Sequence, residues 1–315
     1  MSAITTFEPG ARIALVFPGQ AAQSPEMLDP FRSDPRFAVG YSLVCDLLHR
    51  DPLADAPERG ARLHENATSS LLTVLASVLA LDRLRSQHEA LTPVGTAGYS
   101  VGQWSAMYAA GMIELEPLLR TVYARAMEMN RCDAAAKGGM LAVVGVREAD
   151  LSRICETAHA AGHFLAIANF NAPAHYSLSG SADGLAFAEE QLQILNPKVL
   201  LRVPVAGAWH CALLQPAVGP FRSWLEDLRL ANPRLPVIDN VTAQPLPDQP
   251  GELRARLAQH LAVPVCWRQD IEALAQSGAT AFVEVGFGNI LTKFGMFIAR
   301  KARHVAFTDL AGAAA

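Results

Sequence analysis

The chain has 315 residues, of which 51% are hydrophobic and 18% are charged, and its formal net charge is −4. These values are typical of a globular protein with a sizeable core, and they exclude a largely disordered chain. Without a general positive charge, we expect no nucleic-acid partner. Because the chain contains no uninterrupted apolar run of about 18 residues, we also expect no membrane partner and no membrane-spanning segment.

The beginning of the chain and its cysteines both bear on the cellular compartment of the protein. The start, MSAITTFEPGARIALVFPGQ, lacks the charged residues and the long apolar stretch of a signal peptide. The five cysteines are scattered along the chain and form no C-x-x-C pair. An odd, scattered set is typical of reduced thiols, so we expect a cytoplasmic protein.

Strands and helices alternate in the first part of the chain. The predicted elements are, in order, a strand at 12–17, short helices within 24–65, a long helix at 68–87, a strand near 93–98, and helices near 101–110 and 115–131. The long helix is apolar nearly all round until Asp82, which is typical of a helix buried against a sheet. This order predicts a parallel sheet with crossover helices.

The pattern changes after residue 137. Strands are predicted at 140–146, 164–169, 175–180 and 198–205, with helices at 148–161 and 183–194. This β-α-β-β-α-β order is that of a ferredoxin-like unit. A helix at 212–228, strand-like segments near 236–241 and 281–285, and a last helix near 289–302 follow. We therefore predict an α/β protein in which a large domain (1–137 and 205–315) carries a small inserted ferredoxin-like α+β subdomain (138–204).

A G-x-S-x-G pentapeptide, Gly98-Tyr99-Ser100-Val101-Gly102, lies between a predicted strand and a predicted helix. A nucleophile elbow places a serine on such a turn, where only small flanking residues fit and the N–H groups of the next helix point at the hydroxyl. A glycine-rich turn with an ordinary serine would produce the same five letters. The pentapeptide alone leaves both interpretations open.

A reactive serine needs a base, and the chain has nine histidines. His210 differs from the others because it follows a strand and a loop of small residues and then opens a helix. By itself, this histidine could equally cap a helix or belong to the core. His159 and His163 are four residues apart but lack a nearby third ligand, so we expect no metal site.

Seven motifs accompany these two residues, and one of them contains His210 itself. They are Phe17-Pro18-Gly19-Gln20 with Gln23; Tyr108-Ala109-Ala110-Gly111-Met112-Ile113; Arg125; Asn169-Phe170-Asn171-Ala172-Pro173; Trp209-His210-Cys211-Ala212-Leu213; Pro236-Val237-Ile238-Asp239-Asn240-Val241; and Glu284-Val285-Gly286-Phe287-Gly288 with Leu291-Thr292. With these motifs in this order, the chain resembles, nearly end to end, the malonyl-CoA:acyl carrier protein transacylases and the related acyltransferase domains of polyketide synthases. The resemblance implies an α/β-hydrolase-like large domain.

The resemblance also implies the catalytic roles. Ser100 would be the nucleophile that accepts the acyl group, and His210 its general base and acid. The backbone N–H groups of Gln20 and Val101 would form the oxyanion hole. In this family a backbone carbonyl orients the histidine, and the matching segment here makes the carbonyl of Cys266 the candidate.

Further residues are implied to select the substrate. In the family, the arginine at the position of Arg125 binds the free carboxylate of a malonyl group, for which a planar guanidinium is well suited. Trp209 would leave little room for an α-methyl group and favours malonyl over methylmalonyl, unless its ring packs away from the site. Tyr99, Gln103, Asn171 and Trp209 are expected to line the pocket. Tyr99 and Gln103 depart from the family, which usually has His and Glu there, and Thr68-Ser69-Ser70-Leu71 replaces a common Gln-Pro pair.

The resemblance implies an acyltransferase that moves a malonyl group from malonyl-CoA to the phosphopantetheine thiol of an acyl carrier protein, through an acyl-serine, in fatty acid or polyketide synthesis. No metal or redox cofactor is expected. Three alternatives stay open: an acyl hydrolase that uses the same residues, a transferase for another acyl group, and a non-catalytic docking module. Basic residues of the last predicted helix, Lys293, Arg300, Lys301 and Arg303, would either receive an acidic carrier protein or form a solvated helix end.

Overall fold

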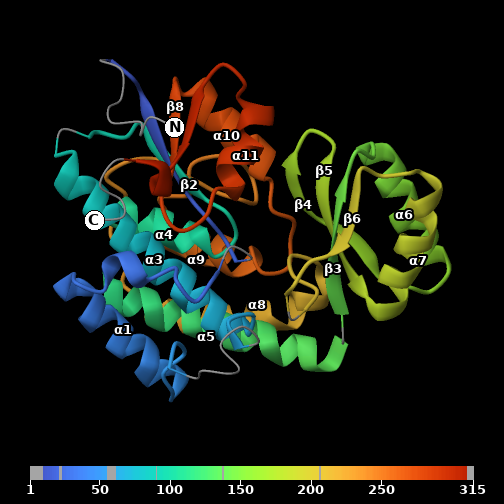
Figure 1. The fold of residues 1–315 in the computed structure, drawn as a ribbon. Helices are drawn as coiled ribbons and strands as arrows, with labels where there is room; N and C mark the ends of the chain where they lie inside the picture. The colour runs from blue at the N-terminus through green and yellow to red at the C-terminus, as the bar shows by residue number, and fades with distance from the viewer. Residues whose placement is uncertain are drawn as a thin grey trace.

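The computed structural model describes residues 10–20, 23–54, 62–89, 91–136, 138–205 and 207–310. In these ranges the strands form two separate sheets, one parallel and one antiparallel, each with its own helices (Figure 1). The predicted α/β class, with a parallel sheet in one unit and a separate antiparallel sheet in another, is confirmed.

The parallel sheet has the strand order β7-β2-β1-β8-β9. Its strands are β1 (Ile13–Phe17), β2 (Gly95–Gly98), β7 (Val237–Ile238), β8 (Ala281–Glu284) and β9 (Arg303–Ala306). Every neighbouring pair in it is parallel. All five residues of β1 are buried, as expected for a central strand with both faces covered. The loops after β1 and β2 therefore open at the same edge of the sheet.

Eight helices of the described residues belong to this larger unit. They are α1 (Pro35–Leu48), α3 (Asn66–Gln87), α4 (Gly102–Ala109), α5 (Leu115–Ala136), α8 (Gln215–Glu226), α9 (Pro250–Gln259), α10 (Trp267–Gln276) and α11 (Ile290–Ile298). Helix α3 is long and apolar enough to cross a membrane, but 83% of its apolar window is buried inside the fold. It is therefore a core helix, as its pattern predicted.

The antiparallel sheet has the order β4-β5-β3-β6. Its unit comprises β3 (Gly138–Val144), α6 (Glu148–Ala160), β4 (Leu165–Ala172), β5 (His175–Ser181), α7 (Ala182–Ile194) and β6 (Val199–Arg202). Helices α6 and α7 cover one face of the sheet (Figure 1), where Leu141 and Val143 of β3 enter a small core. Met140 and Ala142 point the other way and line a cavity against the parallel-sheet unit. The domain limits themselves stay a prediction.

The C-terminal part differs most from the prediction. The last helix ends at Ile298 rather than near residue 302, and the chain then adds β9 alongside β8. Arg300 and Lys301 consequently lie beyond the last helix and Arg303 begins a strand, so only Lys293 of the four basic residues lies on that helix, contrary to the prediction.

Candidate active site

Ser100 occupies a strained turn between β2 and α4. Its φ is +54°, in the left-handed region that a serine rarely adopts. A Cβ on Gly98 would lie 1.9 Å from the carbonyl oxygen of Gly102, and one on Gly102 would lie 2.3 Å from that of Phe17. Both flanking positions thus require glycine. This is the geometry of a nucleophile elbow, and the strain is typical of a functional position.

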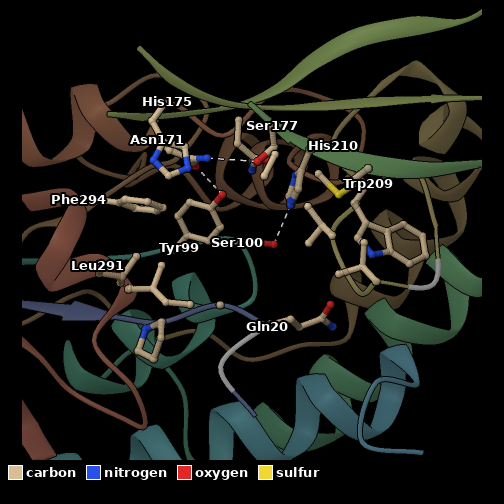
Figure 2. Close-up of a pocket in the computed structure, with 18 residues that line it drawn as sticks. Gln20, Tyr99, Ser100, Asn171, His175, Ser177, Trp209, His210, Leu291 and Phe294 are labelled. Carbon is tan, nitrogen blue, oxygen red and sulfur yellow. Dashed lines mark hydrogen bonds between the residues drawn. The ribbon is translucent and has the colours of Figure 1, made fainter. Parts of the chain in front are cut away.

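His210 lies within hydrogen-bonding distance of the hydroxyl of Ser100. Its Nε2 is 2.7 Å from Ser100 Oγ, and its Nδ1 is 3.0 Å from the backbone carbonyl oxygen of His260 (Figure 2 shows the first contact). A carbonyl only accepts, so Nδ1 must carry the proton, and the lone pair of Nε2 faces the hydroxyl. The pair therefore has the arrangement of a nucleophile with its general base.

The prediction that Cys266 orients this histidine is wrong. The carbonyl of Cys266 accepts a hydrogen bond from the N–H of Asp270, 3.0 Å away, as α10 begins. The orienting carbonyl belongs to His260, just after α9, and the ring of His260 also packs against that of His210 with centroids 5.1 Å apart.

Burial keeps the imidazole of His210 neutral. It lowers the pKa of His210 to about 3, with the positive charge of Arg125 acting in the same direction and backbone hydrogen bonds opposing it. A general base acts in its unprotonated form, so His210 is ready to accept the proton of Ser100 at neutral pH.

The pH dependence of serine acylation should follow from this pKa. The protonated, inactive form of His210 appears only well below pH 6.5, because its pKa is lowered and not raised. With p-nitrophenyl acetate as a small acyl donor, we expect the rate of Ser100 acylation to stay level from pH 8 to below pH 6. A rate that falls to half near pH 6.5 would contradict the lowered pKa of the buried His210.

Arg125 lies beside the same hydroxyl. Its Nη2 is 3.3 Å from Ser100 Oγ, and the side chain is 2% exposed. Burial lowers its pKa to about 10, so the guanidinium stays charged at neutral pH. It makes no ion pair with any residue that the structure describes. A buried cation without a counter-charge is costly, which indicates a site for an anionic group.

The two predicted oxyanion donors are the backbone N–H groups of Gln20 and Val101. Within the described part of the chain, neither the N–H of Val101 nor that of Gln20 donates a hydrogen bond. The side chain of Gln20 is fixed, because its Nε2 donates to Asn66 Oδ1 at 2.7 Å. Gln20 also lines the pocket beside Ser100. The oxyanion role of both groups stays a prediction.

A buried asparagine, which the sequence analysis did not single out, holds the serine. Asn240 Oδ1 accepts the backbone N–H of Ser100 at 2.8 Å. Its own backbone N–H donates to Gln103 Oε1 at 3.0 Å, and its Nδ2 donates to Asp270 Oδ2 at 2.8 Å. Gln103 is thus not a pocket residue, contrary to the prediction, but supports the elbow from behind. The only sequence signal was the motif that contains Asn240.

Replacing Asn240 with alanine should therefore slow acylation without altering the substrate pocket. A displacement of a reacting atom by about 1 Å can cost about 100-fold in rate. We expect a loss of that order in the acylation rate with p-nitrophenyl acetate, measured beside exposed Asn232→Ala as control. An unchanged rate in a folded Asn240→Ala protein would show that this contact does not position Ser100.

A cavity of about 170 Å³ extends from Ser100 between the two sheets. Predicted pocket residues Tyr99, Asn171 and Trp209 line it (Figure 2). The other lining residues are Pro18, Gly19, Gln20, Met140, Ala142, Asn169, His175, Ser177, Val203, Val205, His210, Ile290, Leu291 and Phe294. The cavity wall is mostly apolar. Its residues from α11, Ile290, Leu291 and Phe294, were not predicted to line the pocket, because only folding brings that helix close to the elbow.

The hydroxyl of Tyr99 donates to Asn171 Oδ1 at 2.7 Å, and Asn171 Nδ2 donates to Ser177 Oγ at 3.1 Å (Figure 2). This short chain of hydrogen bonds connects the elbow with β4 and β5 of the antiparallel sheet. Tyr99 thus occupies the pocket wall with a fixed orientation.

The described residues contain no cluster of three metal-ligating side chains. His159 and His163 instead contact the rings of Phe164 and Phe187, respectively.

A strained serine, a neutral histidine with a carbonyl behind it and a buried cation form an arrangement that is suited to acyl transfer. The comparisons agree with this class. Residues 45–313 match the acyl transferase domain family, and the chain belongs to that family.

Similar proteins cover the chain almost completely. It is 27% identical to a malonyl CoA-acyl carrier protein transacylase of Bacillus subtilis, over 95% of this chain and 94% of the relative. It is 30% identical to the polyketide biosynthesis malonyl CoA-acyl carrier protein transacylase PksC of the same organism, over 89% and 94%. The predicted family resemblance is confirmed.

Solved structures show the same fold. An acyl-carrier-protein S-malonyltransferase of Burkholderia pseudomallei superposes with a TM-score of 0.87 at 28% identity, over 96% of this chain and 98% of that one. A malonyl-transacylase solved in complex with a type II polyketide synthase acyl-carrier protein gives a TM-score of 0.88 at 26% identity, with the same coverage.

Proposed function

We propose that this protein transfers a malonyl group from malonyl-CoA to the phosphopantetheine thiol of an acyl carrier protein, in fatty acid or polyketide synthesis. The observation that carries this proposal is the buried guanidinium of Arg125, which lies 3.3 Å from Ser100 Oγ and has no ion-pair partner among the described residues. An acyl group attached to Ser100 that ends in a carboxylate would supply the missing negative charge. The names of the relatives, one of which is a polyketide biosynthesis protein, support the same donor and acceptor.

In the first half-reaction, His210 Nε2 takes the proton of Ser100 while Oγ attacks the thioester carbonyl carbon. The carbonyl oxygen gains negative charge, which the N–H groups of Gln20 and Val101 would stabilise by hydrogen bonds. The carbon–sulfur bond then breaks, and CoA leaves with the proton from His210. The malonyl group is now an ester on Ser100.

In the second half-reaction, the thiol of the carrier protein replaces CoA. His210 accepts the thiol proton, the sulfur attacks the ester carbonyl, and the proton returns to Ser100 Oγ as the new thioester leaves. Serine, histidine and backbone N–H groups supply every proton and charge that these steps need. We therefore propose that the reaction uses no metal or redox cofactor.

A malonyl carboxylate bound by Arg125 would also change the pKa of His210. Arg125 lowers the pKa of His210, so a bound malonyl carboxylate would offset that effect and make the imidazole a stronger base in the complex. Donor binding and proton transfer are thereby coupled.

Trp209 supports malonyl over methylmalonyl as the donor. Trp209 is buried and lines the cavity one residue before His210, so a branch on the α-carbon would meet a bulky ring. One unaccommodated methyl group is worth roughly 10- to 200-fold in selectivity.

A cytoplasmic location fits this proposal. All five cysteines are free thiols, which suits a reducing compartment, and the substrates of the proposed reaction are intracellular thioesters.

The donor specificity can be tested by intact-mass spectrometry after incubation with malonyl-, methylmalonyl- or acetyl-CoA. We expect rapid, complete labelling of one residue by malonyl-CoA and labelling at least about tenfold slower by the other two. Equal labelling rates for malonyl- and acetyl-CoA would contradict the role of Arg125 and, with it, the proposed donor.

A further inference from the structure

A buried carboxyl group lies directly behind the nucleophile elbow. Asp270 belongs to the first turn of α10 and is 0% exposed. Its Oδ2 accepts a hydrogen bond from Asn240 Nδ2 at 2.8 Å, whereas its Oδ1 has no hydrogen-bond partner in the described part of the chain. Burying a half-paired carboxyl group costs folding free energy, so stability alone gives no reason for an aspartate at this position.

Burial favours the neutral form of this carboxyl group. It raises the pKa of Asp270 well above the ordinary value, the negative charge of Asp239 acts in the same direction, and the hydrogen bond from Asn240 opposes both. A neutral carboxyl group still has a carbonyl oxygen that accepts hydrogen bonds. We therefore expect Asp270 to act on Asn240 through hydrogen bonding and not through charge.

Asn240 has a fixed backbone but a side-chain amide that can turn. Its backbone N–H donates to Gln103 Oε1 at 3.0 Å, and its backbone carbonyl accepts the N–H of Cys266 at 2.8 Å. The oxygen and nitrogen ends of an amide have nearly the same shape, so packing does not decide which end faces Ser100. The choice depends on the hydrogen bonds at the two ends.

The backbone N–H of Ser100 requires the oxygen end. Asn240 Oδ1 accepts this N–H at 2.8 Å, and the same orientation directs Nδ2 to Asp270. In the reversed orientation, the NH2 group would face the N–H of Ser100, and the strained turn, with φ at +54°, would lose its acceptor. An acceptor at position 270 therefore favours the orientation that the elbow needs.

We propose that Asp270 is a positioning residue for serine acylation: by accepting from Asn240 Nδ2, it keeps Asn240 Oδ1 on the N–H of Ser100 and so fixes the elbow. This inference rests on the acyl-serine step of the proposed function, but not on its donor or its acceptor. Asp270 does not line the cavity. Its loss should therefore slow acylation and leave the binding of substrate unchanged.

The test compares Asp270→Leu, which removes the acceptor, with Asp270→Asn, which keeps a carbonyl oxygen in its place. Asp270→Leu is also combined with Asn240→Ala. Acylation of Ser100 is measured with p-nitrophenyl acetate, which needs neither a malonyl donor nor a carrier protein, and the affinity for CoA is measured by calorimetry. Asp183→Leu is the matched control, because Asp183 is an exposed residue in the first turn of α7.

We expect Asp270→Leu to slow acylation roughly 10- to 100-fold with unchanged affinity for CoA. Asp270→Asn should stay within about threefold of the native rate, since it still accepts from Asn240. The double variant should be no slower than Asn240→Ala alone, because both residues act through one contact with Ser100. The control should match the native protein.

A native acylation rate in folded Asp270→Leu would overturn the proposal. So would losses of Asp270→Leu and Asn240→Ala that multiply in the double variant. If Asp270→Leu does not fold, Asp270→Asn decides: a rate near the native one supports the proposal, and a rate as low as that of Asn240→Ala overturns it. If the native protein formed the acyl-serine but passed no malonyl group to a carrier protein, the proposed function would fail and the role of Asp270 would stand on these acylation rates.

Discussion

Replacing Ser100 with alanine is expected to abolish acyl-enzyme formation and to lower malonyl transfer at least about a thousandfold. The hydroxyl is the only group that the elbow presents to His210, at 2.7 Å, and no other described hydroxyl contacts that Nε2. Binding of malonyl-CoA should persist, because Arg125 and the cavity wall are unchanged. Intact-mass spectrometry measures the adduct, and a coupled thiol assay measures transfer.

Ser86→Ala is a suitable control, since the hydroxyl of this exposed serine only donates to a carbonyl of its own helix. It should retain full activity. A Ser100→Ala protein that still acquires a stable malonyl adduct would place the nucleophile elsewhere.

Replacing Arg125 with alanine is expected to change the donor preference of the enzyme. Removing one partner of a buried ion pair costs about 3–5 kcal/mol, which corresponds to a loss of roughly 10²- to 10⁴-fold in kcat/KM for malonyl-CoA. Acetyl-CoA has no carboxylate, so its kcat/KM should fall by a few-fold at most or should rise. With the guanidinium gone, the pKa of His210 should also rise, since that charge lowers it. In the pH profile with acetyl-CoA, the decline in rate on the acid side should therefore occur at a higher pH than in the native protein.

Two further variants sharpen this test. Arg131→Ala removes an exposed arginine of the same helix, which pairs with Glu128, and should leave both donors unaffected. Arg125→Lys keeps the charge but not the planar fork, so its kcat/KM for malonyl-CoA should be intermediate. Equal losses with malonyl- and acetyl-CoA in Arg125→Ala would show that the residue supports the elbow and does not bind the carboxylate.

Local sequence patterns predicted most of this fold. The apolar run of β1 and the apolar surface of α3 each indicate their element and its burial directly. β9 escaped prediction because its four residues follow a short turn after α11, and only pairing with β8 makes them a strand. Short edge elements depend on tertiary contacts more than on their own sequence.

The sequence predicted those parts of the site that consist of particular side chains. Ser100, His210 and Arg125 have identities that their chemistry demands, and the structure brings them together. The carbonyl behind His210 could not be located in this way, because every residue has one. Its position depends on the path of the chain between α9 and α10, six residues away from the predicted Cys266.

Gln103 shows the converse difficulty. Its place directly after the pentapeptide indicated a pocket residue, but it lies at the start of α4, does not line the cavity, and accepts a hydrogen bond from the backbone of Asn240. A motif specifies which residues are near the nucleophile, whereas helix geometry decides which of them point toward the substrate.

The central claim, transfer of a malonyl group through Ser100 to a carrier protein, is tested most directly by the fate of isolated malonyl-enzyme. The protein is labelled with malonyl-CoA, freed of excess donor, and divided between buffer alone and buffer with a holo acyl carrier protein. Intact-mass spectrometry then follows both proteins over time. We expect the adduct to persist in buffer and to move to the carrier within seconds. Rapid loss in buffer as free malonate, with no malonyl-carrier formed, would contradict the account and identify a hydrolase.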